Sequence, residues 1–282
     1  MTSVVTFGDA ENQLIDECFE FAKALVKDAG ELVKEGYSKS NDDLGIVEKV
    51  AKWDMVTDYD KKTEAFLIGA IKTKYPDHKF IAEESEATNS ALTENPTWII
   101  DPIDGTNNFI RHIPFVAISV AFVWKKEICI GIVYNPILND FYSARLGNGA
   151  FLNGKQIHCN KVEKIEDATL GHEVSFIRVQ KHRERNIKQV VSFASAAQGF
   201  RSFGSCCISL TFVARGTLDG YQISELFAWD IAAAVLLIRE AGGYCCKPDG
   251  SPIDLNDPKL ICGATKELCD ALIKLNKEAL GL

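Results

Sequence analysis

The chain has 282 residues, of which 46% are hydrophobic and 25% are charged, the balance of an ordinary globular protein. Its formal net charge of −8 argues against a general nucleic-acid-binding protein. No apolar run is long enough to span a bilayer, and the start "MTSVVTFGDAENQ" lacks the pattern of a secretory signal, so we expect a cytoplasmic protein that binds neither nucleic acid nor membrane.

The first half of the chain predicts two helices and several strands. Apolar residues recur at three- and four-residue intervals from about residue 12 to 36, which indicates a long amphipathic helix. A second helix should run from about 59 to 75 and end before a proline. Residues 79–82 and 98–101 are typical of short buried strands, and residues 115–134 predict a hairpin around the polar turn "KKE".

The second half alternates between strand and helix patterns. In chain order we expect short strands over 141–157, a helix over 183–197, a strand over 200–204, a helix over 205–216, a strand over 218–223, a helix over 230–243, strands near 242–246 and 259–264, and a last helix from about 266. Such alternation predicts a layered α/β or α+β fold. The nine cysteines include no C-x-x-C pair, so we interpret them as reduced, mostly buried thiols.

Acidic residues follow or begin predicted elements in four separate segments. Each segment admits a plain structural interpretation, because a pair of glutamates after a strand is typical of a solvated turn and an aspartate at a helix start caps the helix. The alternative interpretation treats the acids as one site that holds a cation. The residues concerned are Glu83 and Glu84, Asp101 and Asp104, Asp230, and Asp58 and Asp60.

The stretch "TWIIDPIDGT" favours the second interpretation. It places Asp101 and Asp104 at the end of a buried run, where two acids are costly unless a cation neutralises them. Mg²⁺ prefers oxygen ligands, which the two carboxylates and the carbonyl of Ile103 would supply from a proline-stiffened turn. Gly105 would let the backbone approach a phosphate, and the Thr106 hydroxyl would orient a water. In a two-metal site one cation activates the water and the other stabilises the leaving oxygen.

Phosphatases of the haloacid dehalogenase type are the closest rival for this pattern. They also place an aspartate pair before Gly-Thr, but their nucleophilic aspartate lies two residues before the second one. That position is Pro102 in this chain, which has no nucleophile to offer. The pattern therefore favours attack by water and not by a protein side chain.

The segments "VTDYD", "AEES", "WIIDPIDGTNNF" and "WDIAAA", in this order, resemble the inositol monophosphatase family of magnesium-dependent, lithium-sensitive phosphomonoesterases. The resemblance covers nearly the whole chain. It implies the αβαβα sandwich of the inositol monophosphatase and fructose-1,6-bisphosphatase type. It also implies a homodimer, and one catalytic domain over 1–282 with tightly packed lobes of roughly 1–150 and 151–282. The implied substrate is a small phosphate ester, with inositol 1-phosphate first among the candidates.

The resemblance also implies roles for individual residues. Two or three Mg²⁺ ions would bind per subunit. Glu83, Asp101 and the Ile103 carbonyl would hold the first, and Asp101, Asp104 and Asp230 the second. A third, weaker ion would lie near Glu83 and Glu84. Thr106, hydrogen-bonded to Asp60, would activate the attacking water, with Glu83 beside it. The implied phosphate and substrate contacts are Lys49, Asp104, Gly105, Thr106, Gly204, Ser205, Cys206, Ile223, Glu225 and Asp230.

Some positions depart from the family pattern. Ala82 stands where the family usually has glycine, and Asn107 replaces a common threonine. Ile223 replaces a glutamate that grips an inositol hydroxyl, and an isoleucine cannot accept a hydrogen bond. Glu225, two residues on, is a candidate to take over that role, and Cys206 stands where a smaller residue is usual.

These departures leave other functions open. The same chemistry could act on a sugar phosphate, a nucleotide 3′-phosphate or an inositol polyphosphate. A metal- or phosphate-binding relative without catalysis is a further alternative, disfavoured because Asp60 and Thr106 are both present.

Overall fold

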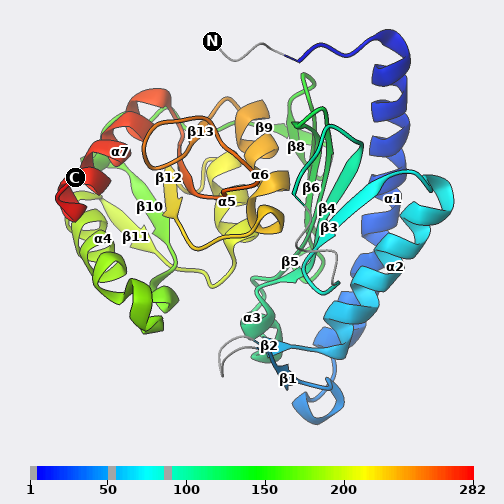
Figure 1. Cartoon of the computed structure of the whole chain (residues 1–282). Coiled ribbons are helices and arrows are strands. Elements are labelled where there is room, and N and C mark those ends of the chain that lie inside the picture. Colours follow the sequence, from blue (N-terminus) through cyan, green and yellow to red (C-terminus); the bar gives the residue numbers. More distant parts are fainter. Residues whose placement is uncertain (1–4, 50–54, 86–90) are drawn as a thin grey trace.

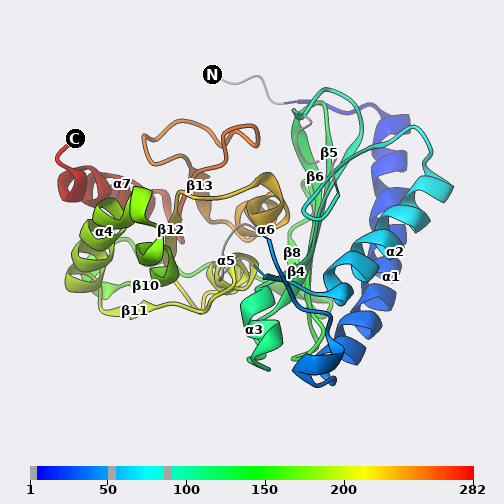
Figure 2. The ribbon, with the colours of Figure 1, turned by 60° about the horizontal axis from the view of Figure 1, so that its bottom comes forward.

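Two β-sheets and three layers of helices alternate through the molecule (Figure 1). The computed structural model describes residues 5–49, 55–85 and 91–282. From one outer face to the other the helices are α1 (Asp9–Tyr37) and α2 (Asp58–Lys74), then α5 (Cys206–Ala214) and α6 (Ala228–Glu240), then α4 (Arg183–Ala196) and α7 (Lys266–Leu280), as Figure 2 shows. This order confirms the predicted layered α+β fold, an αβαβα sandwich.

The large sheet has seven strands in the order β3-β4-β5-β6-β7-β8-β9, so its neighbours follow the chain. β3 runs parallel to β4, and all other neighbours are antiparallel. The strands are β3 (Lys79–Ala82), β4 (Thr97–Asp104), β5 (Ala117–Trp124), β6 (Glu127–Asn135), β7 (Asp140–Arg145), β8 (Ala150–Leu152) and β9 (Lys155–Ile157).

The small sheet has five strands in the order β11-β10-β12-β14-β13 and mixes parallel with antiparallel pairs. Its strands are β10 (Thr169–His172), β11 (Gly199–Arg201), β12 (Gly220–Ile223), β13 (Tyr244–Cys246) and β14 (Leu260–Gly263). A two-stranded ribbon, β1 (Val47–Glu48) and β2 (Met55–Val56), and a short helix, α3 (Thr106–Ile110), complete the regular elements that position the site.

Alternating side chains on β4 pack against the helix layers on both faces of the large sheet. Trp98 and Ile100 are buried against α1 and α2, and Ile99 is buried on the opposite face against α5 and α6. This is the period-two pattern of a strand buried on both faces. The core between the sheets also contains residues from both halves of the chain, from Ile81 to Cys262.

Most predicted elements are confirmed, with some differences. The strand expected over 200–204 is β11, which spans Gly199–Arg201 and leaves residues 202–204 outside the sheet. The predicted turn after residue 101 is a continuation of β4, which ends only at Asp104. Strand β10 was not predicted, because the short sequence "TLGH" contains a glycine and a histidine and no clear alternation. The nine cysteines are free thiols, as expected, and eight of them are buried.

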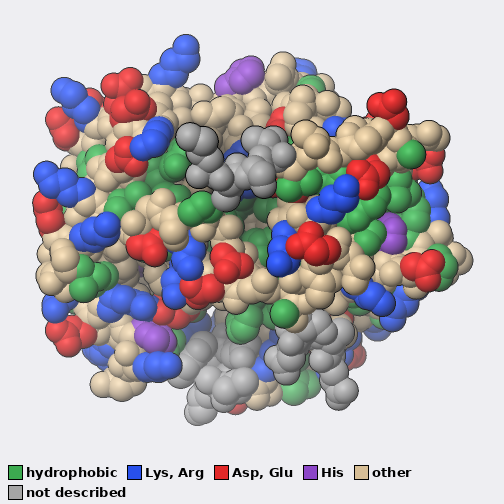
Figure 3. Space-filling model, turned by 45° about the horizontal axis from the view of Figure 1, so that its top comes forward, with side chains coloured by type: hydrophobic (Ala, Val, Ile, Leu, Met, Phe, Trp, Pro, Cys, Tyr) green, Lys and Arg blue, Asp and Glu red, His purple; other side chains and the backbone are tan. Residues whose placement is uncertain are grey.

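The outside of the molecule fits the composition. On the face drawn in Figure 3, Lys and Arg side chains are interspersed with Asp and Glu side chains. Among the described residues, none of the helices has the length and apolar character needed to cross a membrane.

Candidate active site

A β-bulge in β4 brings Asp101 and Asp104 to the same face of the large sheet. Residues three apart in a regular strand point to opposite faces. Here Asp101 pairs with Ser119 and Asp104 pairs with Ala117, so three steps on β4 match two steps on β5. The additional residue reverses the alternation, and Ile103 therefore packs toward α1 and α2 while Asp104 faces α5. Pro102 has no N–H to donate and is well tolerated at such a bulge.

Asp230 reaches the same place from the first turn of α6. Its carboxylate accepts a hydrogen bond from the Phe227 backbone N–H at 2.6 Å, the reciprocal half of a capping box. Asp101, Asp104 and Asp230 each offer an oxygen, and these atoms lie within 4.8 Å of one another. We call these three residues the inner acids. The cap predicted for Asp230 is therefore present, and it aims the carboxylate at the other two.

In the part of the chain that the structure describes, no cationic side chain pairs with the inner acids. None of the ion pairs among the described residues involves Asp101, Asp104 or Asp230. Burial is the main cause that raises the pKa of all three carboxyls, and for Asp101 the nearby charges of Glu83, Asp104 and Asp230 raise it further. Three converging hard oxygen donors without a counter-charge fit a divalent cation such as Mg²⁺.

Backbone and hydroxyl donors hold Asp104 in place. Its carboxylate accepts a very short hydrogen bond from the Ser205 hydroxyl and a bond of 2.8 Å from the Cys207 N–H. The Cys206 N–H donates to the other carboxylate oxygen at 3.3 Å. The start of α5 thus binds Asp104 with its free N–H groups, as helix starts do with anions.

Thr106 and Asp60 form a hydrogen-bonded pair next to the inner acids. The Thr106 hydroxyl lies 3.1 Å from Asp60 Oδ1 and 3.2 Å from the Ile103 carbonyl oxygen. Asp60 is fully buried, and its other oxygen accepts from the Thr57 N–H at 2.8 Å and from the Thr57 hydroxyl at 2.6 Å. Burial raises the pKa of Asp60 to about 7. The predicted contact between Thr106 and Asp60 is therefore present.

Gly105 connects this pair to the inner acids. It precedes α3 with φ of 90°, a left-handed conformation that favours glycine. A Cβ at this position would come within 2.9 Å of the Phe115 carbonyl oxygen. Only glycine fits this turn without displacing the neighbouring backbone.

Glu83 and Glu84 differ from the inner acids because Lys49 forms an ion pair with both. Lys49 Nζ lies 3.0 Å from Glu83 and 2.5 Å from Glu84. Although burial opposes it, the two carboxylates raise the pKa of Lys49. We call Glu83 and Glu84 the outer acids. Glu83 is close enough to Asp101 to raise the pKa of that carboxyl, but it lies outside the group that converges within 4.8 Å.

The residues expected on the alcohol side of the substrate do not all face the acids. Ile223 ends β12 and is 2% exposed, packed in the core between the sheets. Glu225 forms a very short ion pair with Arg185 and lies 3.5 Å from His182 Nδ1. Gly204, Ser205 and Cys206 do lie at the site, through the hydrogen bonds to Asp104.

Several residues that orient the site were not singled out from the sequence. Thr57 anchors Asp60, and Glu64 accepts from the Glu84 N–H at 2.7 Å. Asn108 donates to the Phe203 carbonyl at 2.8 Å, and Glu173 accepts from the Gly204 N–H at 3.2 Å. "TDYD" is a recognisable capping pattern and could have revealed Thr57, whereas the other contacts join distant segments.

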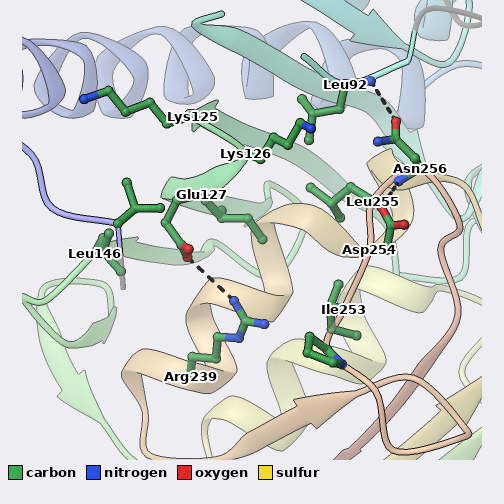
Figure 4. A pocket seen from close by; sticks show the side chains of 13 residues that line it. Leu92, Lys125, Lys126, Glu127, Leu146, Arg239, Ile253, Asp254, Leu255 and Asn256 are labelled. Atoms are coloured by element: carbon green, nitrogen blue, oxygen red, sulfur yellow. Dashed lines mark hydrogen bonds and ion pairs between the residues drawn. The ribbon is translucent and has the colours of Figure 1, made fainter. Parts of the chain in front are cut away.

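A cavity of about 740 Å³ lies at the opposite end of β5 from the acids. Figure 4 shows Lys125, Lys126 and Glu127 of the β5–β6 hairpin on one side of it and Arg239 of α6 on another. Arg239 lies 3.8 Å from Glu127, and the Asn256 side chain accepts from the Leu92 N–H at 2.7 Å. The residues that line it include none of the inner or outer acids, so it is separate from the candidate site.

Comparisons with known proteins agree with the geometry. A model of the inositol monophosphatase family matches residues 14–280. Inositol monophosphatase 1 of Homo sapiens is 37% identical over 265 residues, which cover 92% of this chain and 93% of the human protein. Inositol monophosphatase 3 of Solanum lycopersicum is 35% identical over 272 residues, which cover 95% of this chain and 100% of the tomato protein.

Two solved structures share the fold over most of their length. The extragenic suppressor protein suhB of Bartonella henselae superposes with a TM-score of 0.82 at 28% identity, covering 90% of this chain and 96% of that one. The IMPase of Thermotoga maritima superposes with a TM-score of 0.82 at 26% identity, covering 94% and 98%.

Proposed function

This chain belongs to the inositol monophosphatase family, which implies a magnesium-dependent phosphomonoesterase, and from this premise we propose that it hydrolyses inositol 1-phosphate to inositol and phosphate. The observation that carries the proposal is the convergence of the inner acids, which have no ion-pair partner among the described residues, beside the hydrogen-bonded pair of Thr106 and Asp60. Acids alone would support only cation binding. The hydroxyl with its buried carboxylate adds a group that can take part in proton transfer.

The proposed roles follow from the hydrogen bonds of the chain. Thr57 fixes Asp60, and Asp60 accepts a hydrogen bond from the Thr106 hydroxyl, so the Thr106 oxygen is left to accept a hydrogen bond from the attacking water. As the water gives a proton to the Thr106 oxygen, Thr106 would pass its own hydroxyl proton to Asp60, whose pKa of about 7 suits a proton acceptor near neutral pH. When bound, Mg²⁺ would neutralise the phosphate and lower the pKa of that water.

We assign the cation ligands as the sequence predicts. Asp101, Asp104, Asp230, Glu83 and the Ile103 carbonyl would hold two Mg²⁺ ions, and Glu84 would contribute to a weaker third. The outer acids can join only if Lys49 turns away from them. Lys49 would then be free to approach the phosphate, as the family resemblance implies for this residue.

The remaining assignments concern the phosphate, the alcohol and the assembly. The N–H groups of Gly105 and Thr106 would bind phosphate oxygens, and Gly204 to Cys206 would contact the alcohol. We further propose one catalytic domain with lobes of roughly 1–150 and 151–282, a homodimer, and inhibition by Li⁺. The core shared by both halves of the chain supports the single domain.

Phosphate release from inositol 1-phosphate, measured with Mg²⁺ and with EDTA, tests the proposal. We expect turnover that requires Mg²⁺ and falls at millimolar Li⁺. No magnesium-dependent release from any of a broad panel of phosphate monoesters would refute it.

A second substrate class is favoured by one observation. Ile223 offers no hydrogen-bond acceptor, and Glu225 is held by Arg185, so neither replaces the glutamate expected to grip an inositol hydroxyl. The same chemistry on a sugar phosphate, a nucleotide 3′-phosphate or an inositol polyphosphate is therefore the alternative. The ratio of kcat/KM values across these esters decides between them, because a missing acceptor weakens discrimination in favour of inositol.

A further inference from the structure

The segment 202–205, between β11 and α5, determines where Asp104 points. Ser205 and the first two N–H groups of α5 supply the hydrogen bonds to the Asp104 carboxylate. The segment itself belongs to no strand or helix. Its position must therefore be fixed by contacts with side chains from other parts of the chain.

Glu173, directly after β10, provides two of these contacts. Its Oε2 accepts from the Ser202 hydroxyl at 3.2 Å and from the Gly204 N–H at 3.2 Å. Asn108 of α3 holds the other side by donating to the Phe203 carbonyl at 2.8 Å. Gly204 has φ of 73°, and a Cβ there would come within 2.9 Å of the Asn108 side chain, so the turn is closely fitted. Figure 2 shows the start of α5 next to α3, as these contacts require.

The burial of the Glu173 carboxyl is energetically unfavourable, which argues against a purely structural role. It is 5% exposed, and none of the ion pairs among the described residues gives it a cationic partner. Burial, with a smaller effect of the Asp104 charge, raises the pKa of Glu173 to about 7. Its Oε1 has no hydrogen-bond partner in the described part of the chain. A buried carboxyl of this kind normally destabilises the fold, so its hydrogen bonds to the segment 202–205 require another explanation.

We propose that Glu173 is a positioning residue of the active site, which holds the segment 202–205 so that Ser205 and α5 orient Asp104 as a cation ligand. The inference rests on the proposed function and extends it to a residue outside the proposed cation, phosphate and alcohol contacts. Groups that orient metal ligands in this way typically change metal affinity or activity about 10- to 100-fold when they are removed.

The test compares Glu173→Leu, Glu173→Gln and a control, Glu166→Leu, which removes an exposed carboxylate of the same lobe. Mg²⁺ binding is measured by calorimetry, and kcat, KM and the half-activating Mg²⁺ concentration by phosphate release. We expect Glu173→Leu to raise the Mg²⁺ dissociation constant and the half-activating concentration roughly 10-fold or more, with KM at saturating Mg²⁺ changed less than about threefold. Glu173→Gln keeps an acceptor oxygen and should stay within about threefold of the parent, as should the control.

Two results would overturn the proposal. The first is a folded Glu173→Leu protein with parental Mg²⁺ binding. The second is a Glu173→Gln protein as impaired as Glu173→Leu, since the charge and not the hydrogen bonds would then matter. If Glu173→Leu does not fold, the Ser202→Ala variant provides the test, because it removes one of the two hydrogen bonds that Glu173 accepts. Parental Mg²⁺ binding in Ser202→Ala would then contradict the positioning role of Glu173. A parent protein that binds Mg²⁺ but cleaves no ester refutes the proposed function and leaves this calorimetric comparison intact.

Discussion

The inner acids and the outer acids, which we assign to one proposed site, balance their charge in different ways. The inner acids, Asp101, Asp104 and Asp230, are clustered, and within residues 5–49, 55–85 and 91–282 no ion pair reaches them. The outer acids, Glu83 and Glu84, are paired with Lys49 at the edge of the site. The inner carboxylates are therefore neutralised by protons or by a cation that binds to them, whereas the outer ones already have Lys49 as an ion-pair partner. The difference shows that acidic residues which look alike in a sequence can differ in how the folded chain compensates their charge.

The largest expected effect comes from changing an inner acid. Asp101→Asn should lower kcat by roughly three orders of magnitude, because the proposed site uses this carboxylate for two cations. The same substitution removes a buried charge, so the metal-free variant should unfold at a higher temperature than the metal-free parent. Phosphate release and thermal unfolding measure the two effects, with Asp167→Asn on the exposed surface as the control. Unchanged turnover in Asp101→Asn would contradict the proposal that the inner acids bind the cations needed for catalysis.

The pH dependence of stability should differ between the metal-free and the magnesium-bound protein. The pKa values of the inner acids and of Asp60, the last about 7, are raised in the folded state, so that state binds more protons than the unfolded chain. Stability of the metal-free protein is then present at low pH and is lost as pH rises from about 5 to 8. We expect the unfolding midpoint to fall by roughly 5–10 °C over this range.

Mg²⁺ should reverse this trend, because it replaces the protons on the inner acids and binds more tightly as pH rises. Unfolding midpoints at four pH values, with EDTA and with Mg²⁺, measure both curves. The metal-free Asp101→Asn protein is the matched control and should show a flatter curve. A metal-free parent that gains stability from pH 5 to pH 8 would contradict the assignment.

The outer acids provide a smaller test. Lys49→Met removes their internal cation, so we expect Mg²⁺ to bind near Glu83 and Glu84 more readily, and the KM for the ester to rise about 10-fold because the proposed phosphate contact is lost. Lys155→Met on the exposed end of the large sheet is the control. If Mg²⁺ binding weakens in Lys49→Met, Lys49 supports the cations and does not compete with them.

Asp101 and Asp104 could be predicted from the sequence because their signal is local, whereas Asp230 lies in a distant segment. "DPID" at the end of an apolar run indicates buried charge, and a cation is the simplest compensation. The bulge that turns Asp104 to the same face as Asp101 was not predicted, because the pattern of residues does not show where the strand pairing shifts. Thr57 lies three residues from Asp60 within a capping pattern and was within reach of sequence reasoning.

The contacts that hold the segment 202–205, and through it Asp104, could not be predicted from the sequence. Glu173 meets Ser202 and Gly204, which lie about thirty residues along the chain, and it follows a strand too short to show alternation. The partner of Glu225 is similarly distant, since Arg185 lies on α4. Contacts of this kind depend on how two sheets and three helix layers pack, which periodicity does not determine.

The smallest expected effect concerns Glu225, which the sequence offered as a substitute for the glutamate absent at Ile223. In the structure Arg185 forms an ion pair with it, as Lys49 does with the outer acids. Glu225→Gln should therefore change KM for inositol 1-phosphate less than about threefold, while Arg185→Gln, which frees the carboxylate, should change it more. Steady-state kinetics of both variants and of the double variant measure the coupling. A KM increase of tenfold or more in Glu225→Gln alone would show that Glu225 breaks its ion pair with Arg185 and binds the substrate. An ion pair within the chain would then not distinguish Glu225 and the outer acids from the inner acids.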